Sequence, residues 1–381
     1  MKAKKWVILF VSLMVMCLLV ITSLNYFVDP CGYFRAQGGT CYSLNDDYYL
    51  REIKAEHIRT CGKNYDAFLI GGSKAGSIKV DSLSKLDGYK YYNAWVLSGT
   101  FEDYYYYTKY ILKTNKPKKI VWQLSTTELR DLNREHLGSN YTIPAQVMGQ
   151  SKLLEAISFL FKNPSLSVDE LKLDKSSITP SLPTGERNIN KYYGYQAAHK
   201  NNYYERYIKS SAEENIKHLL NGGAGKRTQN VNDGIELIRR AKSACEEAGV
   251  KFQLYVAPTF IGEQLHYEGD GYYYFLKRLL AIQSEVWCFN DINEYTCNPY
   301  NFYNNGHFYY EIGDIVMETI AQDKQKYPGF GTKVTLNNLG TYIDQRKENY
   351  KKLRDYYLKN KKLPIGKYQD SSDLVRIEHT K

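Results

Sequence analysis

The stretch DAFLIGGSKAGS (Asp66–Ser77) begins with an apolar run and ends in glycines and serines. A short apolar run that stops at such a turn signal is typical of a buried strand. Four more runs of this kind follow along the chain. They are YYNAWVLSG (Tyr91–Gly99), KIVWQLS (Lys119–Ser125), VKFQLYVAP (Val250–Pro258) and EVWCFND (Glu285–Asp291). The sequence therefore predicts five buried strands.

Segments with helical periodicity lie between these strands. Apolar residues recur near a spacing of 3.6 in Phe101–Thr114, Val231–Ala248 and Tyr272–Ser284. Alternating strands and helices form βαβ units, which produce a mostly parallel sheet covered on both faces. We therefore expect an α/β fold with three layers.

The alternation of strands and helices is interrupted after the third strand. Residues 126–226 include SKLLEAISFLFKN, a predicted amphipathic helix, and a polar segment rich in Ser, Pro and Tyr. Open α/β sheets bind ligands at their carboxyl edge, and so long an insertion is rarely a plain loop. We expect residues 126–226 to form a helical cap over that edge, within an outer domain of residues 25–328. Residues 329–381 are expected to be a peripheral basic helix and tail.

The segment before the first strand is a candidate membrane anchor. WVILFVSLMVMCLLVITSL (Trp6–Leu24) carries no charge over 19 residues, which is enough for a helix that crosses a bilayer. Three lysines precede it, so the positive-inside rule places residues 1–5 in the cytoplasm and the chain after Asn25 outside. A cleaved signal peptide is the alternative, but bulky residues follow the span where cleavage needs small ones. We expect an uncleaved, single-pass anchor in the cell membrane.

The net charge of +10 divides at this span. Three of the 51 basic residues precede it, which leaves 48 basic against 41 acidic residues outside. Thr341–Lys381 holds 11 of these basic residues and 6 of the acidic ones. A basic surface outside the membrane does not easily meet nucleic acid, so the expected partners are acidic lipid headgroups or an anionic envelope polymer. A solvated helix face is the alternative.

Six of the seven cysteines follow the span, in a compartment where disulfides persist. Cys31–Cys41 and Cys288–Cys297 are the short-loop candidates, and buried free thiols are the alternative. No CxxC pair or closely spaced histidines suggest a metal site. The GGSKAG segment lacks both the P-loop and the dinucleotide-binding patterns, and we expect no cofactor.

Ser73 is the candidate nucleophile. Gly71 and Gly72 let the backbone turn sharply as the first strand ends, which exposes the hydroxyl of Ser73 beside backbone N–H groups at the start of the next segment. An ordinary glycine-serine turn that caps a helix is the alternative.

The segment FYNNGHFYYEIGDIV carries the candidate base. In it, His307 follows a polar turn and opens a predicted helix, and Asn304 lies three residues earlier. A histidine at the same edge of the sheet could accept the proton of Ser73, as nucleophilic catalysis by a hydroxyl requires. A structural or solvated histidine is the alternative.

Two further strand ends carry candidate oxyanion donors. Gly99, at the end of the second strand, could present its N–H beside that of Ser73 to a developing oxyanion. Ser125, Thr126 and Thr127 end the third strand and could add a side-chain donor.

Together these motifs resemble those of SGNH/GDSL hydrolases, in particular the membrane-anchored envelope branch typified by the D-alanyl transfer protein DltD and the alginate O-acetylation proteins. The matching segments are NYFVDPCGYF after the anchor, FLIGGSKAGS, YNAWVLSGT and FYNNGHFYYEIGD. The resemblance implies a flavodoxin-like parallel sheet, with Ser73 as nucleophile, His307 as general base and Gly99 as an oxyanion donor. It also implies a surface acyltransferase or esterase acting on O-acyl esters, acetyl or D-alanyl, of an envelope polysaccharide or teichoic-acid-like polymer. Such proteins often work beside a membrane-bound O-acyltransferase.

Two positions depart from the pattern of that family. The family places an aspartate three residues before the histidine, where this chain has Asn304, and its third-block asparagine is absent near Ser125–Thr127. Loss of the orienting carboxylate in a serine triad can cost on the order of 10⁴ in rate, although an asparagine carbonyl can also accept the histidine N–H. Asp291 is a substitute candidate, with a turn or helix cap as its alternative role. A noncatalytic scaffold that binds polymer, or holds a membrane-bound O-acyltransferase, is the alternative function.

Overall fold

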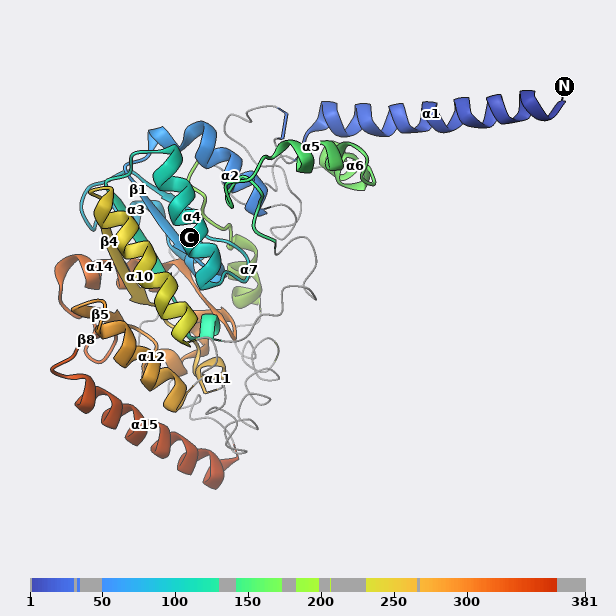
Figure 1. Cartoon of the computed structure of the whole chain (residues 1–381). Helices are drawn as coiled ribbons and strands as arrows, with labels where there is room; N and C mark the ends of the chain where they lie inside the picture. Colours follow the sequence, from blue (N-terminus) through green and yellow to red (C-terminus); the bar gives the residue numbers. More distant parts are fainter. Residues whose placement is uncertain are drawn as a thin grey trace.

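The centre of the molecule is a six-stranded sheet with the order β2-β1-β3-β4-β5-β8. The computed structural model describes residues 2–30, 33–34, 50–129, 142–172, 183–198, 206, 231–265 and 268–361. The first five strands are parallel, and β8 runs antiparallel to β5. Their bounds are β1 (Ala67–Gly71), β2 (Tyr91–Asn93), β3 (Lys119–Leu124), β4 (Lys251–Val256), β5 (Glu285–Cys288) and β8 (Thr332–Thr335). The predicted α/β class with a mostly parallel sheet is confirmed (Figure 1).

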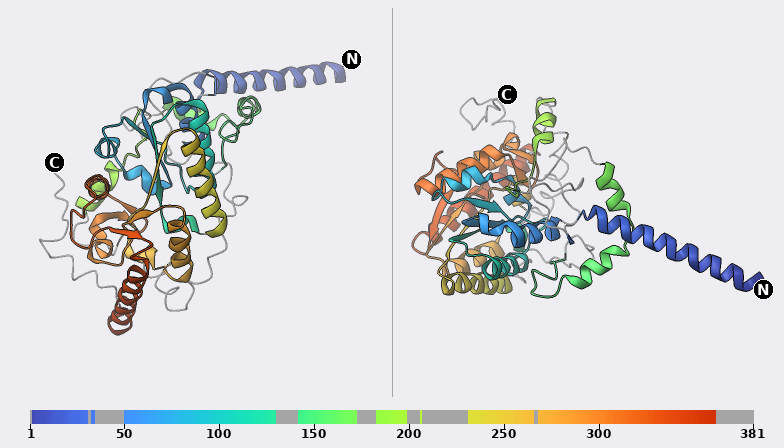
Figure 2. Two further views of the ribbon diagram at one scale, coloured as in Figure 1. Left: turned by 60° about the vertical axis from the view of Figure 1, so that its left-hand side comes forward. Right: turned by 90° about the horizontal axis from the view of Figure 1, so that it is seen from above.

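Helices cover both faces of this sheet (Figures 1 and 2). Side chains alternate along a strand, so Phe68 and Ile70 of β1 enter one core while Ala67 and Leu69 enter the other. The first core is shared by α2 (Leu50–Cys61), α4 (Phe101–Thr114), α10 (Val231–Glu247) and α12 (Asp270–Leu280). The second is shared by α3 (Val80–Ser84) and α14 (Tyr310–Gln322).

The second strand is shorter than predicted. β2 ends at Asn93, so Gly99 lies in the loop that leads to α4 instead of at the strand end. The chain still follows β1 beyond that point, because the N–H of Val96 donates to the carbonyl of Gly71 over 2.9 Å. This irregular continuation carries Ser98 and Gly99 to the carboxyl end of β1.

The C-terminal part of the domain is more than a peripheral helix. β8 completes the sheet beside β5, and α15 (Leu339–Asn360) packs next to it. Arg346 of α15 is buried, donates to both carboxylate oxygens of Glu268, and lies 3.0 Å from the Asp291 carboxylate. This ion-pair cluster ties α15 to the body of the domain. The rest of the predicted basic tail, residues 362–381, lies outside the described residues.

Helix α1 (Lys2–Val28) projects from the domain (Figures 1 and 2). It is long and apolar enough to cross a membrane. Within the predicted cap region, the structure describes η3 (Thr126–Leu129), α5 (Leu153–Leu160), α6 (Ser165–Lys172) and α7 (Asn190–Ala198). α5 forms where the amphipathic helix was predicted, but it lies against α1 together with α6 (Figure 2). Residues 130–141, 173–182 and most of 199–230 lie outside the described residues, so the cap remains a prediction.

The short-loop disulfide between Cys288 and Cys297 is wrong. Both thiols are free and buried, because Cys288 belongs to the core on one face of the sheet and Cys297 to the core on the other. Burial raises the pKa of each of these two thiols to about 12. Cys31 and Cys41 lie outside the described residues.

Candidate active site

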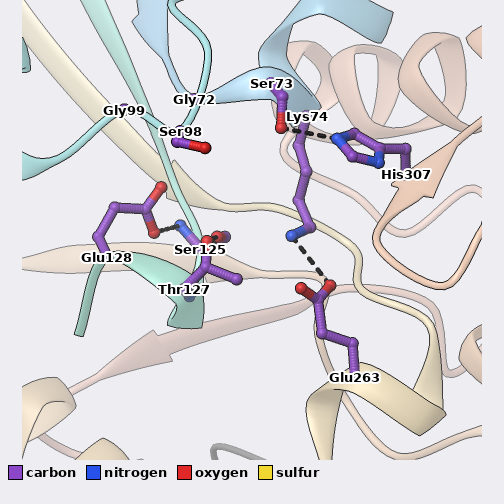
Figure 3. A pocket seen from close by; sticks show the side chains of 10 residues that line it. All are labelled: Gly72, Ser73, Lys74, Ser98, Gly99, Ser125, Thr127, Glu128, Glu263 and His307. Carbon is purple, nitrogen blue, oxygen red and sulfur yellow. Dashed lines mark hydrogen bonds and ion pairs between the residues drawn. The ribbon is translucent and has the colours of Figure 1, made fainter. Parts of the chain in front are cut away.

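A polar pocket opens at the carboxyl ends of β1 and β3 (Figure 3). β2 lies on one side of β1 and β3 lies on the other. The strand order therefore reverses direction at β1, which makes this the switch point of the sheet. Doubly wound sheets bind their ligands at such a switch point. None of the lining residues is a large aliphatic residue, Phe, Tyr or Trp. They are Gly72, Ser73, Lys74, Ser98, Gly99, Ser125, Thr127, Glu128, Glu263 and His307.

Ser73 is the first residue of a 3-10 helix, η2 (Ser73–Ser77), directly after the β1 turn. The turn requires glycine at position 71, because a Cβ there would lie 2.7 Å from the Cβ of Ala75 and 2.8 Å from Oε1 of Gln123. The first residue of a helix has no preceding turn to accept its N–H. The tight turn thus directs both the hydroxyl and the N–H end of η2 toward the pocket.

Ser73, His307 and Asn304 form a chain of side-chain contacts. His307 Nε2 lies 2.6 Å from Ser73 Oγ, and His307 Nδ1 lies 2.8 Å from Asn304 Oδ1. The predicted helix start at His307 is wrong, because His307 begins β7 (His307–Phe308), the second strand of a hairpin with β6 (Phe302–Asn304). α14 starts only at Tyr310. The tight hairpin brings Asn304 beside the imidazole.

The Asn304 side chain determines the tautomer of His307. Its Oδ1 also accepts the backbone N–H of Gly306 over 2.9 Å, so the oxygen, not the amide nitrogen, faces the imidazole. An oxygen acceptor requires a proton on His307 Nδ1. Nε2 then carries the lone pair and accepts the Ser73 hydroxyl proton, as a general base must.

The surroundings of His307 favour its neutral form. Burial, together with the positive charges of Lys74 and Arg187, holds the pKa of His307 well below the ordinary 6.5. The ring of Tyr303 stacks on the imidazole at a centroid distance of 5.3 Å and an angle of 13°. The base is therefore unprotonated at neutral pH and fixed in orientation.

Gly99 lines the pocket opposite Ser73 (Figure 3). A Cβ at position 99 would lie 2.6 Å from Cε1 of Tyr104, so the loop can pass here only with glycine. Ser98, the preceding residue, has a φ of 45°, a conformation that non-glycine residues rarely adopt. Such strain is typical of functional loops, and here it accompanies a serine side chain at the pocket wall.

Three charged groups of the pocket, Lys74, Glu263 and Glu128, were missed by the sequence analysis. The Nζ of Lys74 lies 3.1 Å from Oε2 of Glu263, at α11 (Ile261–Gln264), and both side chains line the pocket. Lys74 could have been noted as the one charge in GGSKAGS. Glu263 follows the fourth strand in a segment that carries no signal of its own.

Glu128 is a buried carboxylate at the wall of the pocket. It accepts hydrogen bonds from the Tyr104 hydroxyl and from the N–H of Ser125, both over 2.7 Å. Burial raises the pKa of Glu128, while these donors and the charge of Lys74 oppose that shift. The carboxylate holds the end of β3 against α4.

The loop after β3 places two of its three predicted donors at the pocket. Ser125 Oγ and Thr127 Oγ1 lie 2.6 Å apart and line the cavity, whereas the Thr126 side chain is buried. Asp291, the substitute orienting carboxylate, instead binds Arg346 and accepts the Thr332 hydroxyl. This ion pair is neither the orienting role nor the turn or helix cap that was its alternative. Among the described residues, no three His, Cys, Asp or Glu side chains gather as metal ligands.

No family model matches the chain, and no curated protein matches it either.

Proposed function

We propose that the chain is a membrane-anchored, extracytoplasmic acyltransferase or esterase of the SGNH-like type. Its substrates are O-acyl esters of an envelope polysaccharide or teichoic-acid-like polymer. The observation that carries the proposal is the 2.6 Å contact between Ser73 Oγ and His307 Nε2, with Asn304 on the other ring nitrogen. A hydroxyl, a neutral base and an orienting acceptor are the parts that nucleophilic catalysis needs.

The reaction proceeds in two halves. Ser73 Oγ attacks the acyl carbonyl carbon while its proton passes to His307 Nε2. The N–H groups of Ser73 and Gly99 hold the resulting oxyanion. The oxyanion collapses, the C–O bond to the donor alcohol breaks, and His307 returns its proton to that alcohol. A polymer hydroxyl, or water, then attacks the acyl-serine with His307 again as base, and the released Ser73 recovers the proton.

Lys74 supports the oxyanion in this scheme. Its ammonium group lines the same pocket as Ser73, and its side chain is only 6% exposed, so its charge is weakly screened. The hydroxyls of Ser125 and Thr127 line the same pocket. In this scheme they donate to the oxyanion in place of the asparagine that SGNH hydrolases carry after the third strand. Lys74 also opposes protonation of His307.

The chemical character of the pocket favours a short acyl group. A fatty acyl chain needs long apolar walls to recover its burial energy, and none of the ten lining residues is Val, Leu, Ile, Met, Phe, Tyr or Trp. An acetyl or alanyl group needs no such wall. This agrees with the acetyl and D-alanyl esters that the family resemblance implies.

A fluorophosphonate probe tests the proposal directly, because it reacts only with an activated serine. We expect labelling of the full chain in detergent, and loss of labelling in Ser73→Ala and His307→Ala. Ser84→Ala is a matched control that leaves the pocket intact. Labelling that persists in Ser73→Ala would exclude Ser73 as nucleophile, and absence of labelling in the unchanged chain would favour the noncatalytic scaffold.

A further inference from the structure

Helix α5 is apolar on two opposite faces. Ala156 and Phe159 are buried against its neighbours. The other face, continued by one residue of α6, exposes five large apolar side chains by 44 to 76%: Leu153, Leu154, Ile157, Phe161 and Leu171. Scattered apolar residues on a surface need no explanation, but a cluster on two short adjacent helices marks a contact with something apolar.

Both helices are fixed to the end of α1 by Asn25. Its side-chain amide donates to the carbonyls of Phe159, Leu160 and Lys162 over 3.0 to 3.2 Å, which closes the C-terminal end of α5. Its Oδ1 accepts the hydroxyl of Ser167 in α6 over 2.7 Å. In Figure 2 the two helices flank α1 where it meets the domain. The five exposed side chains are thus held at one defined level along α1.

That level is the edge of the hydrocarbon layer if α1 crosses a membrane. The apolar run Trp6–Leu24 ends one residue before Asn25, and a helix of its length spans about 30 Å. Tyr26 and Phe27 follow immediately and are exposed by 45% and 67%. Aromatic residues at this height are typical of the interface between lipid and water.

We propose that α5 and α6 lie in the outer-leaflet interface, with the five exposed apolar side chains among the lipid acyl chains. Lys162 and Lys172 lie just after α5 and at the end of α6, where their ammonium groups can reach lipid headgroups. We therefore assign lipid to this surface. The surface lies next to the membrane span, which favours lipid over a soluble protein partner. The proposal rests on α1 as a membrane span and holds whatever reaction the pocket performs.

Depth-dependent fluorescence on the full chain in lipid nanodiscs tests this surface. An environment-sensitive fluorescent amino acid replaces Leu154 or Leu171, and Leu336 is the matched control because it is equally exposed but lies between β8 and α15. We expect several-fold stronger quenching by nitroxide-labelled lipid at Leu154 and Leu171 than at Leu336. Aqueous iodide should quench in the opposite order.

Two outcomes overturn the proposal. Iodide quenching at Leu154 and Leu171 equal to that at Leu336 would place the surface in water. Protection from both quenchers would mean that protein, such as a membrane-bound acyltransferase, covers it. A probe at Leu13 in the middle of α1 separates this failure from failure of the anchor, because lipid must quench Leu13 if α1 spans the bilayer. Fluorophosphonate labelling of Ser73 reports the proposed chemistry independently.

Discussion

The Oδ1 atom of Asn304 accepts the ring N–H of His307 over 2.8 Å, in the place where a Ser-His-Asp triad has a carboxylate. The amide fixes the tautomer of the imidazole but carries no charge to stabilise the imidazolium that forms in the transition state. His307 is therefore oriented as in a Ser-His-Asp triad, but no negative charge stabilises its protonated form.

Asn304→Asp should retain or raise kcat, and Asn304→Ala should lower it on the order of 10²- to 10³-fold, because only the aspartate preserves the acceptor. Hydrolysis of p-nitrophenyl acetate measures both. Asn305→Asp adds the same charge one position further along the turn and is the matched control. A large loss in Asn304→Asp would mean that the amide group itself has a role in the reaction.

The acid limb of the pH profile should lie below 6.5, because the pKa of His307 is held below that value and protonation removes the base. Lys74→Met removes one of the cations that lower this pKa, so activity should be lost at a higher pH than in the unchanged chain. Lys74→Arg keeps the charge and should keep the limb in place. A limb that does not move in Lys74→Met would show that Lys74 does not influence His307.

Gly99→Ala should reduce kcat by about 10²- to 10³-fold, the typical effect of losing one oxyanion donor, because the new Cβ meets the Tyr104 ring and displaces the loop. Gly340→Ala, in α15, adds the same methyl group where it meets nothing within 4 Å. This control should keep full activity. Equal activity in both variants would remove Gly99 from the oxyanion site.

Arg346→Met should lower the free energy of unfolding by about 3–5 kcal/mol, because it leaves the buried carboxylates of Glu268 and Asp291 without their cation. Urea unfolding in detergent measures the change. Arg239→Met breaks an exposed pair with Glu236 and should leave the urea midpoint where it is. If both variants unfold at the same urea concentration, α15 contributes little to the domain.

His57 should make the domain less stable as the pH falls from 6.5 to 4. Burial and the charge of Lys54 lower the pKa of His57 to about 4, so below 6.5 the unfolded chain binds a proton that the folded chain does not. This residue then lowers the free energy of unfolding by up to about 1.4 kcal/mol for each pH unit in that window. Burial raises the pKa of Glu52 to about 7, which acts in the opposite direction, so the test compares two variants. His57→Phe keeps a ring against Tyr92 and should lose less stability than the unchanged chain over this window in urea unfolding. An equal change in both chains would show that the pKa of His57 is not lowered in the folded chain.

The sequence predicted the parts of the fold that depend on local pattern. β1 and β3 are apolar runs that end in turn signals, and α4 has the predicted bounds because Thr100 caps it with a reciprocal bond to Asp103. β8 was missed because four residues, TKVT, carry too little pattern on an edge strand.

The site was predictable only where chemically active residues coincide with a turn signal. Ser73 was found after the glycines that end the first strand and His307 after a polar turn, and their contact joins residues far apart in the chain. The pairing of Lys74 with Glu263 was not predictable, since it depends on how α11 packs beside η2. The short β6–β7 hairpin was taken for a helix start because the helical pattern of α14 begins three residues later.

The bonds of Asn25 make the N-terminal helix, a candidate membrane span, a part of the folded domain. Proteolytic release after Val28 would take Asn25 away and leave the carbonyls of Phe159, Leu160 and Lys162 without their donor. Ser167 would lose its partner at the same time. A form cleaved after Val28 would therefore lose the hydrogen bonds that fix α5 and α6. The fold thus favours retention of α1 over release of a soluble domain.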